Sequence, residues 1–254
     1  MQHRILWTFA SAIVFAAAAC GGGSSSDETT PAAPAPAPVD PATVGNIMGT
    51  ITLDGTAPAP EEIRMNSDPV CLTEATNTQT EYYVVGDGGV LANVFVYVTE
   101  GLEGRTFPPA TGTMTIDQDG CQYHPHVFGM RVGQTLEILN SDPTLHNIHA
   151  TPSANAEFNM GQPIEGMRFE RTFETPEIMV PFKCDVHSWM NAYVGVLDHP
   201  YFAVTAENGG FDISGLPPGD YVIEAWHERL GTQTQNATIG EGATAELDFT
   251  FTVS

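Results

Sequence analysis

The sequence predicts an all-β fold of the β-sandwich type. From residue 46 onward, short runs rich in Val, Ile, Tyr, Phe and Thr follow one another, and Gly, Pro, Asn and Asp separate them. No stretch in this region has the pattern of a long helix. β-Branched and aromatic residues favour strands, and the separating residues favour turns. Many short strands between such turns are typical of sandwiches and barrels.

The expected strands can be followed along the chain. GNIMGTITLDG (45–55) alternates apolar and small polar residues before a turn, and YYVVGDGGVLANVFVYVTEG (82–101) holds two strand-like runs around GDGG. Later runs of the same kind are TGTMTIDQDG (111–120), TLEILNSD (135–142), RTFETPEIMVPFK (171–183), NAYVGVL (191–197) and FAVTAENGGFDISGLPPGDYVIEAWHE (202–228). The segment SANAEFNMGQPIEG (153–166) has no such pattern, so a loop is expected there.

The N-terminus has the form of an export signal. Arg4 precedes the apolar run ILWTFASAIVFAAAA (5–19), which is too short to cross a bilayer comfortably and ends in small residues. The run leads to Cys20, followed by GGGSSS, and this resembles a bacterial lipoprotein signal, whose cysteine becomes the lipidated first residue. The resemblance implies a lipid anchor to a membrane. The alternative is an ordinary signal peptide cut near Ala19. Either way, the protein is expected in the periplasm or cell envelope.

Composition divides the rest of the chain. Residues 20–45 hold the lipidation cysteine and a Pro/Ala-rich linker, PAAPAPAPVDP, which favours an extended stalk over a packed core. The expected parts are a signal peptide (1–19), the anchor and linker (20–45), an N-terminal β segment (46–84), a region holding most His, Cys and Met clusters (85–198) and a C-terminal module (199–254).

The chain is strongly acidic. Its formal net charge is −23, from 31 acidic residues against 8 basic ones. Binding of nucleic acid phosphates needs a basic surface, so no nucleic acid partner is expected. The charge would steer a basic partner toward the protein, although adaptation to a saline habitat would give the same composition.

The C-terminal module contains NGGFDISGLPPGDYVIEAW (208–226), which reads as a strand, a Pro-Pro-Gly-Asp turn and a second strand. Gly209, Phe211 and the run Leu216 to Tyr221 carry a resemblance to the carboxypeptidase regulatory-like module, a small transthyretin-like β-sandwich. The stretch is short for a complete sandwich of this family. GTITLDGTAPAP (49–60) resembles the module's opening strand, so one interpretation is that residues 46–84 supply missing strands and the intervening region is an insertion.

The stretch KCDVHSWM (183–190) places Cys184, His187 and Met190 at three-residue steps. A thiolate, an imidazole and a thioether together suit copper, and blue-copper sites combine two histidines and one cysteine with a weak methionine. The loop lies between two expected strands, so its side chains can converge. Alone, the string is moderately specific, and it leaves open a buried thiol with unrelated neighbours.

A fourth ligand is available upstream in TLEILNSDPTLHNIHA (135–150), where His146 and Asn147 follow an Asn-Ser-Asp-Pro turn. With this second element, residues 90–198 resemble the cupredoxins, the family of plastocyanin, amicyanin and azurin. The resemblance implies a Greek-key β-sandwich with one type 1 copper site held by His146, Cys184, His187 and Met190. It also implies that His187 lies at the exposed end of the site and passes the electron.

Other assignments of these residues stay open. One cysteine and two histidines would also satisfy zinc, although zinc has little use for Met190. His149 competes with His146 as the first ligand, and His124, His126 and His149 could form a second metal site. Cys71 and Cys121 are left over in an oxidising compartment, where two such cysteines most often form a disulfide.

A site with four protein ligands has no open position for a substrate, so an enzyme is not expected. The sequence predicts an exported copper protein that transfers single electrons between periplasmic redox partners. The alternatives are a copper-binding or copper-delivery protein without electron transfer and a metal-free surface adhesion module.

Overall fold

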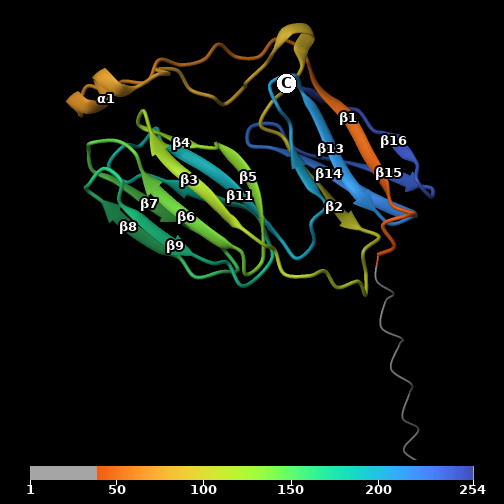
Figure 1. The fold of residues 1–254 in the computed structure, drawn as a ribbon. Helices are drawn as coiled ribbons and strands as arrows, with labels where there is room; N and C mark the ends of the chain where they lie inside the picture. The colour runs from red at the N-terminus through yellow and green to blue at the C-terminus, as the bar shows by residue number, and fades with distance from the viewer. Residues whose placement is uncertain (1–38, 254) are drawn as a thin grey trace, which may run out of the picture. The chain divides into compact units, whose positions relative to one another are not determined.

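The computed structural model describes residues 39–253 (Figure 1), so the expected signal peptide and Cys20 lie outside the described residues. The structure confirms the all-β prediction. The strands are β1 (Gly45–Asp54), β2 (Phe95–Glu100), β3 (Thr113–Asp119), β4 (Gln122–His124), β5 (Val127–Arg131), β6 (Thr135–Asn140), β7 (His146–Ala150), β8 (Phe158–Gln162), β9 (Arg168–Arg171), β10 (Glu177–Lys183), β11 (Asn191–Leu197), β12 (Phe202–Val204), β13 (Gly210–Leu216), β14 (Gly219–His227), β15 (Gly231–Ile239), β16 (Thr244–Glu246) and β17 (Phe249–Thr252).

Two short helical turns accompany the strands, α1 (Pro69–Glu74) and the 3-10 turn η1 (Asp87–Gly89). Among residues 39–253, no helix is long and apolar enough to cross a bilayer.

The central sandwich, residues 113–197, consists of two sheets. One has the strand order β5-β11-β10-β7-β8 and the other β4-β3-β6-β9. Alternating residues of both sheets face inward, and the buried side chains form one apolar core that includes Ile116, Leu136, Phe173, Phe182 and Val194. Packing of two apolar sheet faces accounts for the fold of this region.

The terminal sandwich combines both ends of the described chain. One sheet has the order β13-β1-β16, with β17 also paired to β1, and the other has the order β12-β2-β14-β15. Its core includes Ile47, Ile51, Phe211, Ile223 and Phe249. In Figure 1 the orange strand β1 lies beside the blue strand β13, with which it pairs in antiparallel register.

In the sequence, the central sandwich is inserted between two segments that together form the terminal sandwich. β1 contributes to the terminal sandwich, as one interpretation of residues 46–84 expected. The expected boundary at residue 85 does not coincide with the sheets, because β2 pairs with β12 and β14 of the terminal sandwich. The strands of the central sandwich therefore begin after β2.

The two sandwiches share a small apolar cluster of Phe95, Tyr97, Val127, Met179 and Leu197. Gly195 lets the Phe95 ring approach closely, since a Cβ at position 195 would lie 2.4 Å from the ring. A buried pair between His126 of the central sandwich and Glu228 of the terminal one adds a polar contact.

The prediction of a loop at residues 153–166 is wrong for part of this segment, because it contains strand β8. β8 reads FNMGQ and pairs with β7 from His146 to Ala150. Asn and Gly disfavour strands, so the ladder with β7 and not the local sequence accounts for this strand.

Residues 57–80, here called the strap, run between β1 and β2 and carry α1. An antiparallel bridge between Glu62 and Gln79 ties the two arms of the strap together. Cys71 of α1 forms a disulfide with Cys121, with Cα atoms 5.6 Å apart. Both cysteines are fully buried, with Met65 and Trp189 in the same cluster. The disulfide therefore fastens the strap to the central sandwich.

Candidate metal centre

Two neighbouring strands and one turn position the candidate ligands. His146 begins β7, whereas Cys184, His187 and Met190 lie in the turn between β10 and β11. The turn closes through its own backbone: Met190 N donates to His187 O at 2.9 Å, and Cys184 N donates to Met190 O at 3.1 Å. Because β7 pairs with β10 in antiparallel register, the histidine at the start of β7 and the turn after β10 meet at the same end of the sheet.

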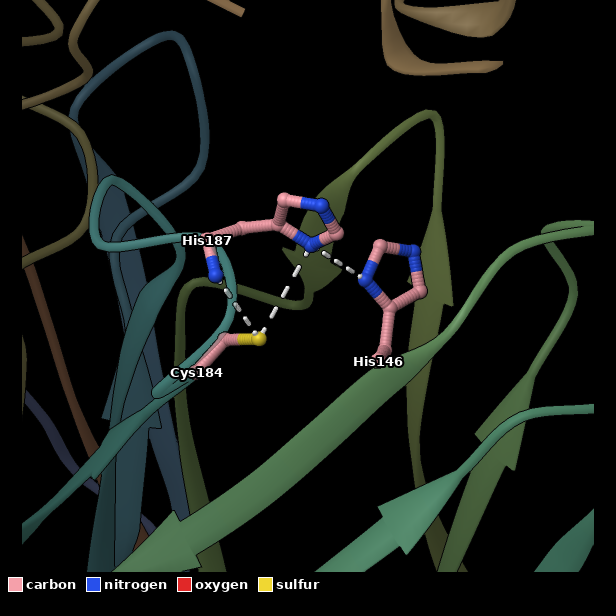
Figure 2. Close-up of side chains that lie close together, drawn as sticks. All are labelled: His146, Cys184 and His187. Atoms are coloured by element: carbon pink, nitrogen blue, oxygen red, sulfur yellow. Dashed lines mark hydrogen bonds between the residues drawn. The ribbon is translucent and has the colours of Figure 1, made fainter. Parts of the chain in front are cut away.

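Three of the four predicted ligands converge. The Nδ1 atoms of His146 and His187 are 2.9 Å apart, and Cys184 Sγ lies 3.9 Å from His187 Nδ1. Figure 2 shows the three side chains pointing toward one another from the strand β7 and the turn. Their donor atoms all lie within 4.8 Å of one another, and all three residues are buried.

Asn147 holds the turn against β7. Its Oδ1 accepts from Asp185 N at 2.7 Å and from Val186 N at 3.3 Å, and it lies 3.3 Å from Cys184 Sγ. A further backbone donor, His187 N, lies 3.3 Å from Cys184 Sγ. The His146–Asn147 pair thus combines a candidate ligand with the side chain that fixes the cysteine turn.

A carboxylate faces the outer nitrogen of each histidine. His146 Nε2 donates to Asp142 Oδ2 at 2.8 Å, and His187 Nε2 donates to Asp68 Oδ2 at 3.1 Å. Asp142 also accepts from Gly120 N and Cys121 N, both at 2.8 Å, so backbone donors hold it in place. An ionised carboxylate is an acceptor alone, so each Nε2 carries the proton.

This tautomer leaves a lone pair on each Nδ1, and the two lone pairs point toward each other and toward a sulfur. Three electron-rich atoms at such distances repel one another unless a proton or a metal cation lies among them. Histidine metal ligands commonly donate their second ring N–H to a carboxylate, which fixes the tautomer and raises the basicity of the ligand. The arrangement therefore has the form of a metal centre.

The electrostatics of Cys184 favour the thiolate. Burial opposes its ionisation, but the contacts with His146 and His187 outweigh burial and lower the pKa of this thiol to about 6. For His146, burial acts against protonation, yet the contacts with Asp142 and Cys184 raise its pKa. The thiolate is the form that binds metal ions.

Met190 is buried and packs in the same core cluster as Cys184. Its backbone closes the ligand turn, as described above. The role of its sulfur as a fourth, axial ligand stays a prediction.

The expectation that His187 forms the exposed end of the site is wrong, because its side chain is 1% exposed. The strap covers it, because Asp68 holds its outer nitrogen and Cys71 Sγ lies 3.8 Å from the same nitrogen. The ring of Trp189, from the ligand turn, lies tilted against the His187 ring with 5.0 Å between centroids. The strap precedes the central sandwich in the sequence, so a pattern confined to the copper motifs could not include it.

The structure separates the histidines proposed for a second metal site. His149 lies between two partly exposed carboxylates, 2.9 Å from Asp185 and 2.8 Å from Glu157. His126 instead bonds Asn191 O and Glu228, and His124 is exposed. Within residues 39–253, no metal-binding group combines these three, and His149 does not take the place of His146.

Sequence reasoning missed the two carboxylates. Asp142 carried a signal, since it lies in the Asn-Ser-Asp-Pro turn four residues before His146. Asp68 carried none, because 119 residues separate it from His187. Two further candidate groups contain Asp68 or Asp142 with Cys71 or Cys121, whose sulfurs are engaged in the disulfide.

Comparisons with known proteins give a partial likeness. The family model of the carboxypeptidase regulatory-like domain matches residues 190–252 and supports the module expected at 199–254. No curated protein matches the chain. A copper-containing nitrite reductase from Thermus scotoductus SA-01 is 21% identical with a TM-score of 0.33, covering 41% of this chain and 26% of its own.

Two smaller copper proteins are also similar. An amicyanin variant in the Cu(I) state is 21% identical with a TM-score of 0.30 and covers 34% of this chain and 84% of its own. A purple cupredoxin from Nitrosopumilus maritimus is 26% identical with a TM-score of 0.29 and covers 33% of this chain and 98% of its own. The carboxypeptidase regulatory-like family model thus matches about a quarter of the chain. The candidate metal centre is formed by His146, Cys184 and His187 of the chain itself.

Proposed function

We propose that the protein is an exported mononuclear copper protein with a type 1 site that transfers single electrons between periplasmic redox partners. The observation that carries the proposal is the convergence of Cys184 Sγ with the Nδ1 atoms of His146 and His187, while both outer nitrogens face carboxylates. This is the donor set that blue-copper sites use.

The donor set fits copper. Cys184 would bind as the thiolate, His146 and His187 through Nδ1, and Met190 as the weak fourth ligand. Bound there, copper would supply a one-electron couple between Cu(I) and Cu(II). Asp142 and Asp68 hold the two rings in orientation, and the buried core around the turn keeps the ligands in place through both oxidation states. Zinc would accept the same thiolate and imidazoles but has no need of a thioether.

The partner that fits the chain is a basic redox protein. Three of the exposed large apolar residues adjoin the site in sequence: Leu72 follows Cys71, Leu145 precedes His146, and Val186 precedes His187. The exposed acids Glu74 and Asp185 belong to the segments of Leu72 and Val186. Exposed apolar side chains with acids close by in the sequence suit a partner that presents apolar and basic groups. Lipidation at Cys20 would hold the protein at a membrane of the cell envelope, within reach of such partners.

Addition of Cu(II) to the purified protein tests the proposal. A type 1 site gives an intense blue colour and narrow copper hyperfine splitting in the EPR spectrum. Cys184→Ser should abolish the colour because the thiolate ligand is lost, whereas Ser188→Ala in the same turn should keep it. Stoichiometric binding of copper without colour would favour copper delivery, and no binding would leave a metal-free adhesion module. Colour that survives in Cys184→Ser would overturn the ligand assignment.

A further inference from the structure

The strap brings a carboxylate to the outer edge of a candidate copper ligand. Asp68 caps the N-terminus of α1 through Oδ1, which accepts from Val70 N at 2.8 Å. Its other oxygen, Oδ2, accepts from Thr144 Oγ1 at 2.7 Å and from His187 Nε2 at 3.1 Å. The carboxylate therefore joins three segments: the strap, the turn before β7 and the ligand turn.

The position of this carboxylate is constrained from both sides. The disulfide with Cys121 holds α1 one turn after Asp68, and Thr144 lies two residues before His146. His187 is 1% exposed, so its Nε2–H is removed from bulk water, and the acceptors near it are the carboxylate of Asp68 at 3.1 Å and the weakly accepting disulfide sulfur of Cys71 at 3.8 Å. Loss of the acceptor would leave a buried donor unpaired, and this cost favours retention of the contact.

We propose that Asp68 is a positioning residue of the copper site, acting from the strap to fix the ring of His187 and to stabilise the oxidised state of the centre. This inference rests on the proposed copper site. Nδ1 of His187 is the nitrogen that faces Cys184 (Figure 2). Because Nε2–H is bound to Asp68, the ring cannot turn away without breaking that contact. The negative charge behind the ring raises the basicity of Nδ1 and stabilises Cu(II) more than Cu(I).

This arrangement divides the work between the two carboxylates. Asp142, next to β7, holds His146 from within the central sandwich, whereas Asp68 reaches His187 from a segment outside it. Both histidines are thereby supported from behind, and the face of His187 opposite the sulfur is closed by protein.

Three variants separate the effects of hydrogen bonding, charge and strap attachment. Asp68→Asn keeps an oxygen acceptor and a good helix cap but removes the charge. Asp68→Ala removes the acceptor as well. Thr144→Val removes the second contact of Asp68 and leaves the carboxylate. Glu74→Gln is the matched control, because it removes one charge from the same helix at an exposed side chain without a contact to His187.

The first measurement uses the metal-free protein. Nitrogen-15 NMR reports the tautomer of His187 and the exchange of its Nε2–H with water. In the parent protein, Asp68→Asn and Glu74→Gln, Nε2 should carry a slowly exchanging proton. In Asp68→Ala, exchange should be about tenfold faster or more, because the proton has lost its acceptor. Unfolding curves show whether each variant is folded.

The second measurement is the reduction potential of the copper-loaded protein. It should rise in both Asp68 variants and change far less in Glu74→Gln and Thr144→Val. Unchanged proton exchange and unchanged potential in Asp68→Ala would overturn the inference, as would a shift in Glu74→Gln equal to that in Asp68→Asn. If the parent protein binds no copper, the proposed function fails, whereas the hydrogen-bonding role of Asp68 is still decided by the NMR experiment.

Discussion

Single residues of this protein show how burial changes the chemistry of an ordinary side chain. His227, at the end of β14, is 2% exposed and lies between the rings of Tyr83 and Phe251, with centroids at 5.8 Å and 6.1 Å. Its Nδ1 accepts from Arg229 N at 3.2 Å. Burial among these groups lowers the pKa of His227 to about 4. The terminal sandwich therefore holds this histidine in its neutral form at neutral pH.

The burial of His227 predicts that this one residue makes the folded protein less stable in acid. The unfolded chain takes up the His227 proton near pH 6.5 and the folded protein near pH 4, so its contribution to stability is present above pH 6.5 and is lost as the pH falls from 6.5 to 4. The two pKa values correspond to roughly 3 kcal/mol. Urea unfolding at several pH values should show less loss of stability below pH 6.5 in His227→Phe than in the parent protein. Equal pH dependence in both proteins would contradict the prediction.

The elements differ in how far the sequence determines them. NAYVGVL and GDYVIEAWH are rich in β-branched and aromatic residues, and both form the expected strands. β8 depends on its partner β7, and its own residues gave no strand signal. In the same way, His146 and the ligand turn could be found from local motifs, because each motif is contiguous. The cover over His187 could not, because it is a contact between segments far apart in sequence.

The strap is the element whose attachment can be tested most directly. Its disulfide closes a loop with a sequence separation of 50 residues, for which chain entropy gives a stabilisation of about 4 kcal/mol. Replacing both Cys71 and Cys121 by alanine should lower the free energy of unfolding by about 2–4 kcal/mol.

Trypsin gives a local measure of the same change. Arg64 is exposed on the strap, and Arg168 is exposed on β9 of the central sandwich. Cleavage after Arg64 should accelerate in the double alanine variant under native conditions, because the released strap can enter the protease. Cleavage after Arg168 should change little and serves as the internal control. Equal acceleration at both sites would indicate global loosening and not release of the strap.

At the scale of the whole molecule, charge is the dominant property. A net charge of −23 produces a negative field that attracts cations and repels anions, and salt weakens it with a screening length of about 8 Å at physiological ionic strength. The proposed centre would therefore exchange electrons faster with positively charged reactants.

Small inorganic redox reagents can measure this effect without a natural partner. The oxidation rate of the reduced copper protein by a cationic cobalt(III) ammine complex should fall as salt is added, whereas the rate with hexacyanoferrate(III) should rise. A neutral reagent of similar size should show little dependence on salt. Salt effects of the same sign for both ions would mean that the field near the site is not negative.

The position of β1 in the sequence has a consequence for folding. β1 precedes every other described strand in the sequence, yet its partners β13, β16 and β17 belong to the last part of the described chain. The central sandwich, whose strands are contiguous in the chain, has all its partners available while β1 still waits with an unpaired edge. A chain that stops after the central sandwich would therefore keep the four candidate metal ligands but leave β1 and β2 without their partner strands. The last strands of the carboxypeptidase regulatory-like module therefore complete the terminal sandwich, because they pair with its first strand.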